Sequence, residues 1–131
     1  MKKTGILNGE ISDVVADLGH TDRIVVCDAG LPIPQEARRI DISLIGGKPS
    51  LVETLEAIAL ELEVEGCIMA AEVKAESPHI LEAVRKVFPD ATWQFVPHTE
   101  FKKLTHDAKA VIRTGEFTHY ANVILVAGVA F

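Results

Sequence analysis

The chain has 131 residues, which predicts one domain, and 48% of them are apolar, which is enough for a packed core. Its formal net charge of −6 argues against binding to nucleic acid, which requires a basic face. The N-terminal stretch MKKTGILNGE lacks the apolar core of a signal peptide, and no apolar run approaches the ~18 residues that cross a membrane.

The first half of the chain predicts a helix, two strands and a second helix. Asn8 can cap the first helix, which Gly19 would end in a left-handed conformation. The run 24–27 is β-branched and too short for a helix, so we expect a buried strand. Residues 38–45, RRIDISLI, alternate polar and apolar, which predicts an edge or antiparallel strand. The sequence SLVE from Ser50 is a capping box that opens the second helix.

The second half continues the alternation of helices and strands. Gly66 would end the second helix segment, and residues 67–73 would form the next strand. Ser77 would cap a helix with proline at its first position. Residues 91–96 predict another strand, and Thr99 would cap a fourth helix that continues to Gly115, with Phe101, Leu104, Ala108 and Val111 facing inward. The C-terminal stretch NVILVAGVAF predicts a last buried strand.

This alternation predicts an α/β fold in which residues 1–131 form a single three-layer α/β/α domain. The sheet should be mostly parallel and possibly mixed. In such sheets ligands bind outside the carboxyl ends of the strands, so we look for site residues at the ends of elements. The two cysteines, Cys27 and Cys67, lie in separate apolar runs, which indicates reduced, buried thiols of a cytoplasmic protein.

Several familiar kinds of site are absent from the sequence. LIGGKPS lacks the upstream glycine and the hydroxyl residue of a phosphate loop, and neither G-x-G-x-x-G nor G-x-S-x-G occurs. No two histidines have the i, i+4 spacing of a helical zinc site. His98, His106 and His119 could converge, but their spacing matches no metal motif. We therefore expect no metal and no cofactor.

Two polar residues flank the strand at 24–27. His20 follows the first helix, whose negative end favours a protonated imidazole, so it is a candidate general acid. Alternatively, it merely caps the last carbonyls of that helix, which is the commoner role. Asp28 ends the strand where substrates bind, and its alternative role is a turn carboxylate that accepts bonds from the AGLPIP loop.

Further candidates follow later strands. His98 lies between the 91–96 strand and the fourth helix, although it could be a surface loop residue. Lys102 and His106 are one turn apart on that helix and off its apolar stripe, so they could reach one ligand, or simply face solvent. Tyr120, the only tyrosine, and Asn122 precede the last strand, and the alternative there is an ordinary turn. These residue types suit proton transfer on a small polyol or sugar.

Two long blocks of the chain resemble one protein family. GILNGEISDVVADLGHTDRIVVCDAGLPIP, residues 5–34, and RTGEFTHYANVILVAGVAF, residues 113–131, are similar to the RbsD/FucU family of sugar mutarotases, in the branch that acts on D-ribose. The resemblance covers essentially the whole chain. It implies an α/β fold, a cytoplasmic location and an isomerase that interconverts the pyranose and furanose forms of β-D-ribose, supplying furanose to ribokinase in ribose catabolism.

The resemblance also assigns residues. The histidine of GH, His20, would be the catalytic proton donor. The sugar would be bound by residues in the DAG and YAN segments and in the fourth helix: Asp28, His98, Tyr120, Ala121 and Asn122, with Lys102 and His106 nearby. No metal or nucleotide is needed, because every step is a proton transfer or a bond rotation. Two alternatives remain: a mutarotase for another sugar such as L-fucose, and a sugar-binding module without turnover.

Members of the family form ring-shaped decamers, so the resemblance implies a homo-oligomer built from pentamers. The spacing of His20 and Asp28 indicates a site shared between subunits. At about 3.3 Å per residue, the strand from Ile24 to Asp28 alone is more than ~10 Å long, and a ribose ring is smaller. Both residues reach one sugar only if the connection before the strand folds back, or if a neighbouring chain supplies part of the site.

Overall fold

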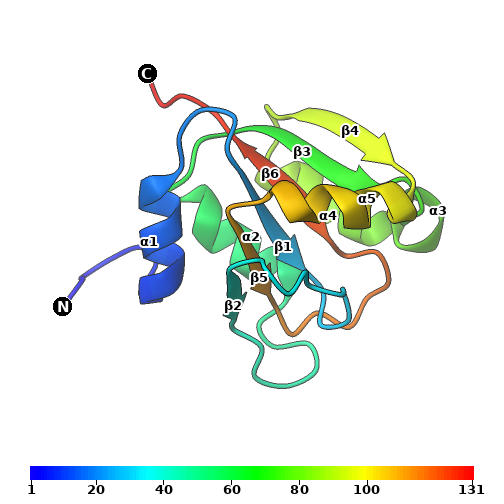
Figure 1. The fold of residues 1–131 in the computed structure, drawn as a ribbon, viewed down its shortest axis with the longest axis horizontal. Helices are drawn as coiled ribbons and strands as arrows, with labels where there is room; N and C mark the ends of the chain where they lie inside the picture. The colour runs from blue at the N-terminus through cyan, green and yellow to red at the C-terminus, as the bar shows by residue number, and fades with distance from the viewer.

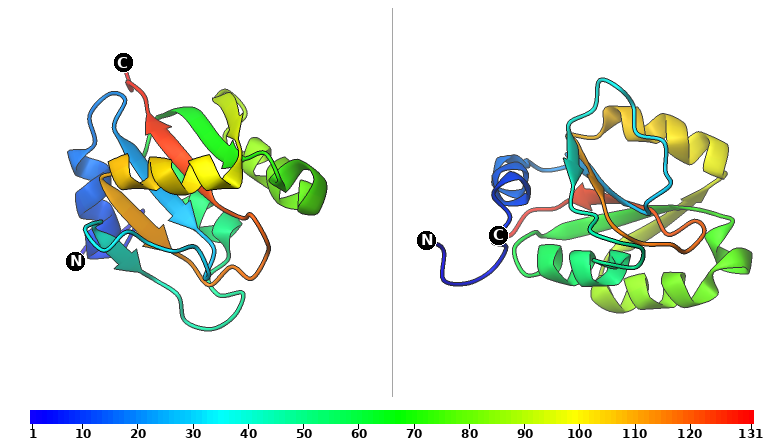
Figure 2. Two further views of the ribbon diagram at one scale, coloured as in Figure 1. Left: turned by 45° about the vertical axis from the view of Figure 1, so that its right-hand side comes forward. Right: turned by 90° about the horizontal axis from the view of Figure 1, so that it is seen from below.

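The computed structural model describes residues 1–131, which form a six-stranded sheet between two layers of helices (Figures 1 and 2). The helices are α1 (Gly9–Asp17), α2 (Leu51–Ala59), α3 (Val73–Glu76), α4 (Pro78–Val87) and α5 (His98–Leu104), and a 3₁₀ turn, η1 (Thr105–Asp107), follows α5. The strands are β1 (Arg23–Cys27), β2 (Arg39–Asp41), β3 (Val64–Ala70), β4 (Thr92–Val96), β5 (Ala110–Arg113) and β6 (Val123–Ala127).

The two faces of the sheet carry separate hydrophobic cores. The larger core joins one face to α1, α2 and α4, and the smaller one joins the other face to Phe101 of α5 and Leu31 of the loop after β1. The right-hand view of Figure 2 shows the molecule from below, with α5 (yellow) on one side of the sheet and α2 and α4 (green) on the other. The predicted three-layer α/β/α domain is confirmed.

The order of strands in the sheet is β2-β5-β1-β6-β3-β4. β6 lies between β1 and β3 and is antiparallel to both, whereas the pairs β2–β5, β5–β1 and β3–β4 are parallel. The sheet is therefore mixed, as the sequence allowed. β2 lies at the edge, as expected, but it is parallel to β5 and covers only three of the eight residues of RRIDISLI.

The largest error of the sequence prediction concerns residues 99–115. The helix α5 ends at Leu104, and residues 110–113, expected in the helix, form the buried strand β5 beside β1. The side chains of Val111 and Ile112 are β-branched and fully buried, which suits a central strand better than a helix. Thr99 does not cap α5 either: Pro97 precedes its first residue, and the carboxylate of Glu72 accepts a hydrogen bond from the His98 backbone N–H.

Three smaller predictions are also wrong. Gly66 lies inside β3 instead of before it, and the short helix α3 takes up the end of the expected strand. Ser77 precedes α4, but its hydroxyl donates to the carbonyl oxygen of His119 at 2.7 Å and does not cap the helix. Gly19 is not left-handed; the left-handed residue after α1 is Thr21, with φ of 71°. The caps at Asn8 and Ser50 are confirmed.

The apolar C-terminal stretch is accounted for largely by β6, whose side chains fill both cores. Only its last residues, including Val129 and Phe131, are exposed. Burial raises the pKa values of the Cys27 and Cys67 thiols to about 12, which keeps both protonated at neutral pH. None of the helices has the length and the hydropathy that crossing a membrane requires.

Candidate active site

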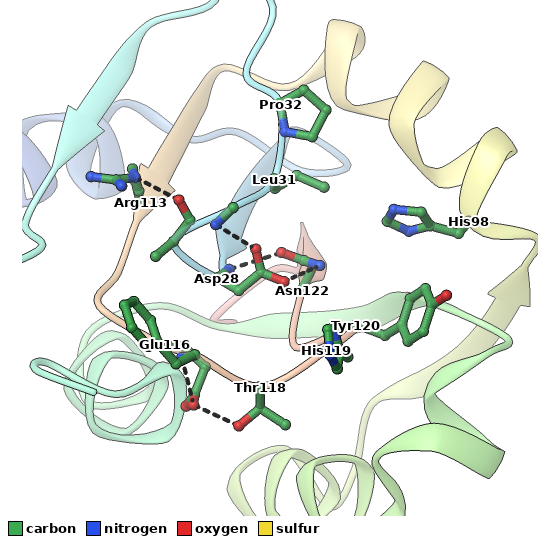
Figure 3. A pocket seen from close by; sticks show the side chains of 13 residues that line it. Asp28, Leu31, Pro32, His98, Arg113, Glu116, Thr118, His119, Tyr120 and Asn122 are labelled. Atoms are coloured by element: carbon green, nitrogen blue, oxygen red, sulfur yellow. Dashed lines mark hydrogen bonds between the residues drawn. The ribbon is translucent and has the colours of Figure 1, made fainter. Parts of the chain in front are cut away.

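A cavity of about 630 Å³ opens at the carboxyl ends of β1 and β5 (Figure 3). Its walls come from the loop after β1, the segment between β5 and β6, and the start of α5. The lining residues are Asp28, Ala29, Gly30, Leu31, Pro32, His98, Arg113, Glu116, Phe117, Thr118, His119, Tyr120 and Asn122. The site therefore lies where open α/β sheets bind ligands.

The sheet topology brings these segments together. β1 and β5 are parallel and in register, so Cys27 pairs with Arg113 and both strands end at the same edge. β6 runs the other way and begins at this edge, where Val123 pairs with Val26. As a result Asn122, just before β6, lies beside Asp28, just after β1, although 94 residues separate them in the chain.

Asp28 and Asn122 form a reciprocal pair at the floor of the cavity. The Asp28 backbone N–H donates to Oδ1 of Asn122 at 2.8 Å, and Nδ2 of Asn122 donates to Oδ2 of Asp28 at 3.0 Å. The Gly30 N–H donates to Oδ1 of Asp28 at 2.9 Å. Asp28 thus accepts a turn hydrogen bond, as one alternative predicted, and also faces the cavity with a fixed orientation, as the other did.

His98 and Tyr120 form a second wall. The His98 ring points into the cavity from the start of α5 (Figure 3) and meets the Tyr120 ring edge-on, with centroids 5.1 Å apart. Its Nδ1 is buried and has no hydrogen-bond partner in the protein, which is uncommon for a buried polar atom. The phenol group of Tyr120 points away from Asp28, so the ring and the backbone of this residue shape the cavity more than its hydroxyl does.

The backbone of Tyr120 is left-handed, with φ of 59°, a conformation that costs a non-glycine residue about 1–3 kcal/mol and tends to occur at functional sites. The preceding carbonyl, that of His119, is held by the hydroxyl of the buried Ser77. This hydrogen bond ties the cavity wall to the start of α4. Sequence reasoning gave Ser77 a different role, because its partner is 42 residues away.

Arg113 and Glu116 brace the rim and were not anticipated. Nε of Arg113 donates to the carbonyl oxygen of Ala29 at 3.0 Å, and Nη1 donates to Asp41 Oδ2 at 3.0 Å. Glu116 accepts from the Leu51 N–H at the start of α2 and from Thr118. The residues RTGEFTH lay in a block that resembled the family, but Arg113 was placed at the end of a helix, so its position at a strand end was missed.

The surroundings of Asp41 strengthen its interaction with Arg113 at the rim. Hydrogen bonds from Ser43, and then from Arg39 and Arg113, hold the pKa of the Asp41 carboxyl well below its usual range. Asp41 therefore stays ionised as a partner for Arg113, which keeps that guanidinium engaged with the protein.

The cavity lining contains no cysteine or serine nucleophile. No group of three or more potential metal ligands occurs in the structure.

His20 lies at the opposite end of β1 from the cavity. It precedes β1, whereas Asp28 follows β1, and the four residue steps of about 3.3 Å along this strand separate its two ends by roughly 13 Å. The connection does not fold back along the strand: Thr21 N–H donates to the carbonyl of Ala127, and Nε2 of His20 lies 2.9 Å from Oε2 of Glu65. His20 also does not cap α1, which was the commoner role considered for it.

Three further predicted residues lie outside the cavity lining. Lys102 is on α5, but His106 lies in η1, where its Nδ1 is 2.6 Å from Oε1 of Glu36. The pKa of Glu36 is lowered by a backbone hydrogen bond and then by His106. Ala121 is fully buried in the core. Of the eight residues named by the resemblance, four lie together in the cavity of one chain: Asp28, His98, Tyr120 and Asn122.

The arrangement defines a class of protein: a mixed-sheet α/β domain with a cavity whose fixed hydrogen-bonding groups suit a small polar ligand. Comparison with known proteins makes this specific. The chain belongs to the RbsD / FucU transport protein family, whose model matches residues 1–130. The family predicted from the sequence is confirmed.

Full-length relatives are closely similar. The chain is 52% identical to the D-ribose pyranase of Geobacillus kaustophilus, covering 100% of this chain and 96% of the relative, and 51% identical to that of Bacillus subtilis, covering 100% of both. It superposes on the structure of Bacillus subtilis RbsD complexed with D-ribose with a TM-score of 0.96, 51% identity and full coverage of both chains. The fucose mutarotase of Streptococcus pneumoniae shares the fold, with a TM-score of 0.86, 22% identity and full coverage of both chains.

The Asp28–Asn122 pair yields a prediction about stability. Asn122→Ala leaves the Asp28 N–H and one carboxylate oxygen without their partner, so we expect the free energy of unfolding to fall by about 1–3 kcal/mol. Urea denaturation measures this change. The matched control is Gln94→Ala, which truncates an exposed amide that makes no hydrogen bond and should change stability by less than about 0.5 kcal/mol. Equal effects of the two substitutions would contradict a structural role for the pair.

Proposed function

We propose that the chain is an isomerase that interconverts the pyranose and furanose forms of β-D-ribose, supplying furanose to a kinase. The observation that carries this is the match, at 51% identity and over the full length, to a structure of Bacillus subtilis RbsD complexed with D-ribose. The cavity agrees with it, because its free polar groups are hydrogen-bonding groups of the kind that orient sugar hydroxyls. The relatives named D-ribose pyranase support the same reaction.

The reaction requires only proton transfers and rotation. A proton is delivered to the ring oxygen and another is removed from the anomeric hydroxyl, so the bond between the anomeric carbon and the ring oxygen breaks and an open-chain aldehyde forms. The aldehyde turns about its bonds and a different hydroxyl attacks it, closing the five-membered ring. Positioned acids and bases contribute roughly 10²–10⁴-fold to such a step, and no metal or nucleotide is required.

The cavity residues have the role of binding and orienting the sugar. The Asp28 carboxylate is held by Gly30 and Asn122 and accepts from sugar hydroxyls with its remaining lone pairs. The His98 ring lines the cavity beside Tyr120. Tyr120 shapes the wall beside His98, and Asn122 shapes the floor. Ala121, Lys102 and His106 lie outside the lining, and the last two would meet only a larger or differently placed ligand.

His20 is the proton donor in this proposal, and it is supplied by a neighbouring copy of the chain. The support is the separation of roughly 13 Å between the two ends of β1, which no single ribose can span. The His20 side chain is also 53% exposed, so it is available to a second subunit. The left-handed residues Thr21 and Tyr120 lie at opposite edges of the sheet, one beside each half of such a site.

The shared site requires a homo-oligomer, which we propose is a ring-shaped assembly of pentamers, a decamer, located in the cytoplasm. The decamer rests on the family resemblance. Large exposed apolar side chains agree with an assembly, above all Phe117, which lines the cavity and is 76% exposed. Leu44 and Ile45 are exposed as well, and the neighbouring Gly46 packs closely against the Phe117 ring.

The first prediction from this proposed function concerns the reaction. NMR exchange spectroscopy on D-ribose should show faster pyranose–furanose exchange with the protein than without it, before and after exhaustive chelation. L-fucose, measured in parallel, tests the alternative that another sugar is the substrate. Ribose that binds but exchanges at the uncatalysed rate would identify a binding module instead. Activity that chelation removes and a metal restores would contradict the proposed chemistry.

The second prediction separates catalysis from binding. His20→Ala should lower the exchange rate by about 10²–10⁴-fold with little change in ribose affinity or melting temperature, because the side chain is half exposed and leaves no cavity. Asp28→Asn should chiefly weaken binding, since it replaces an acceptor of sugar hydroxyls. Exchange kinetics at several ribose concentrations distinguish the two effects. A His20→Ala protein with near-normal rates would mean that the proton donor is another residue, and His106 would be tested next.

The third prediction is complementation between two inactive proteins. His20→Ala retains an intact cavity, and the Tyr120→Ala/Asn122→Ala double variant retains an intact His20. After both are dissociated, mixed 1:1 and reassembled, random assembly should restore about one site in four if the halves come from different chains. The control is the same mixture without dissociation. A reassembled mixed oligomer without activity would place both halves in one chain, and an active monomer by light scattering would exclude a shared site.

A further inference from the structure

The His20 imidazole makes a polar contact with the side chain of Glu65 in the same chain. Nε2 of the ring lies 2.9 Å from Oε2 of the carboxylate, across 45 residues of sequence. Both side chains are about half exposed, at 53% and 44%. An exposed ion pair contributes at most about 1 kcal/mol to stability, so stability is a weak reason for the pair. The backbone on each side points to another reason.

Glu65 is the extra residue of a β-bulge. In the pairing of β3 with β6, Val64 pairs with Ala127 and Gly66 with Val126, so two steps along β3 correspond to one step along β6. Bulges are common next to active sites, where they redirect a side chain. Here the redirected side chain is the carboxylate that meets His20.

The turn that carries His20 is irregular as well and is held at several points. Thr21 is left-handed, with φ of 71°, which is a rare conformation for a β-branched residue. Its N–H donates to the carbonyl of Ala127 at 2.9 Å, and the Ala127 N–H donates back to the carbonyl of Asp22 at 2.8 Å. The Asp22 carboxylate accepts from the Gly19 N–H at 2.9 Å. The turn and the bulge are thus joined to the same end of β6, and together they place His20 against Glu65.

The geometry points to Glu65 as the positioning residue of His20, fixing its orientation and its neutral tautomer so that Nδ1 is the atom that exchanges protons with the substrate. The inference rests on the proposed function, because it takes His20 as the proton donor. An ionised carboxylate only accepts hydrogen bonds, so Nε2 must carry its proton to bind Glu65. In the neutral imidazole the lone pair is then on Nδ1.

The proton balance follows from this assignment. In the charged ring Nδ1–H gives its proton to the ring oxygen of the sugar, the electron pair of that N–H bond remains on Nδ1, and the proton of the anomeric hydroxyl passes to solvent water. The neutral ring later takes a proton back on the same nitrogen when a sugar hydroxyl closes the new ring, and the aldehyde oxygen takes its proton from water. Nε2–H stays bonded to Glu65 throughout, and the carboxylate remains ionised. Glu65 does not touch the substrate in this scheme.

The test uses Glu65→Ala and Glu65→Gln in the full-length protein. Glu65→Ala should lower kcat by about 10- to 100-fold through the misorientation of His20, with KM for ribose within about twofold of the parent value and an unchanged oligomeric state. Glu65→Gln keeps an amide oxygen that can accept from Nε2–H, so it should retain more activity. The matched control is Glu63→Gln, which removes a neighbouring exposed charge that makes no hydrogen bond and should leave kcat unchanged.

Nitrogen-15 NMR of the His20 ring gives a readout that a merely structural role would not move. We expect the Nε2–H tautomer in the parent protein and a mixture of tautomers in Glu65→Ala. Parent-like kcat in Glu65→Ala, or an Nδ1–H tautomer in the parent, would overturn the inference. If instead the parent does not exchange ribose, the proposed function fails, and if His20→Ala is fully active, the proton donor is another residue. In both cases the NMR result still decides whether Glu65 sets the tautomer.

Discussion

The insertion of β6 between β1 and β3, antiparallel to both, is the constraint on which the rest of the structure depends. Because it begins where β1 ends, it brings Asn122 to Asp28 and closes the floor of the cavity. Because it ends where β1 begins, Ala127 holds the turn that carries His20. A parallel strand in the same position would enter the sheet at the other edge, and Asn122 would be a strand length away from Asp28.

This arrangement divides the proposed chemistry between two edges of one sheet. The carboxyl edge holds the binding groups, which are fixed by the Asp28–Asn122 pair and by the braces of Arg113 and Glu116. The other edge holds His20 and Glu65 (Figure 1 shows the two ends of β1 and β6). In the proposed function the cavity of one chain binds the sugar, and the acid reaches that sugar only from a second copy. Assembly would then be a condition of catalysis, in addition to any effect on stability.

Local signals predicted those elements whose interactions are local. The cap at Asn8 and the capping box at Ser50 act within one turn, and the apolar run of β1 needs only burial to become a strand. Predictions failed where a distant partner replaced the local one. Ser77 donates to His119 instead of capping α4, Glu72 takes the place of a cap on α5, and β5 is a strand because β1 and β2 lie on either side of it.

The sequence by itself determined the α/β class, the family and the polar residues at the ends of β1 and β6. Burial, periodicity and capping are properties of neighbouring residues, and a family resemblance needs only their order. Tertiary structure alone decided that Asp28 meets Asn122, that the buried Nδ1 of His98 has no partner, and that His20 faces Glu65 across a bulge. These contacts join residues that are far apart in the chain, and the strand order and direction that create them follow from packing of the whole sheet rather than from any one segment.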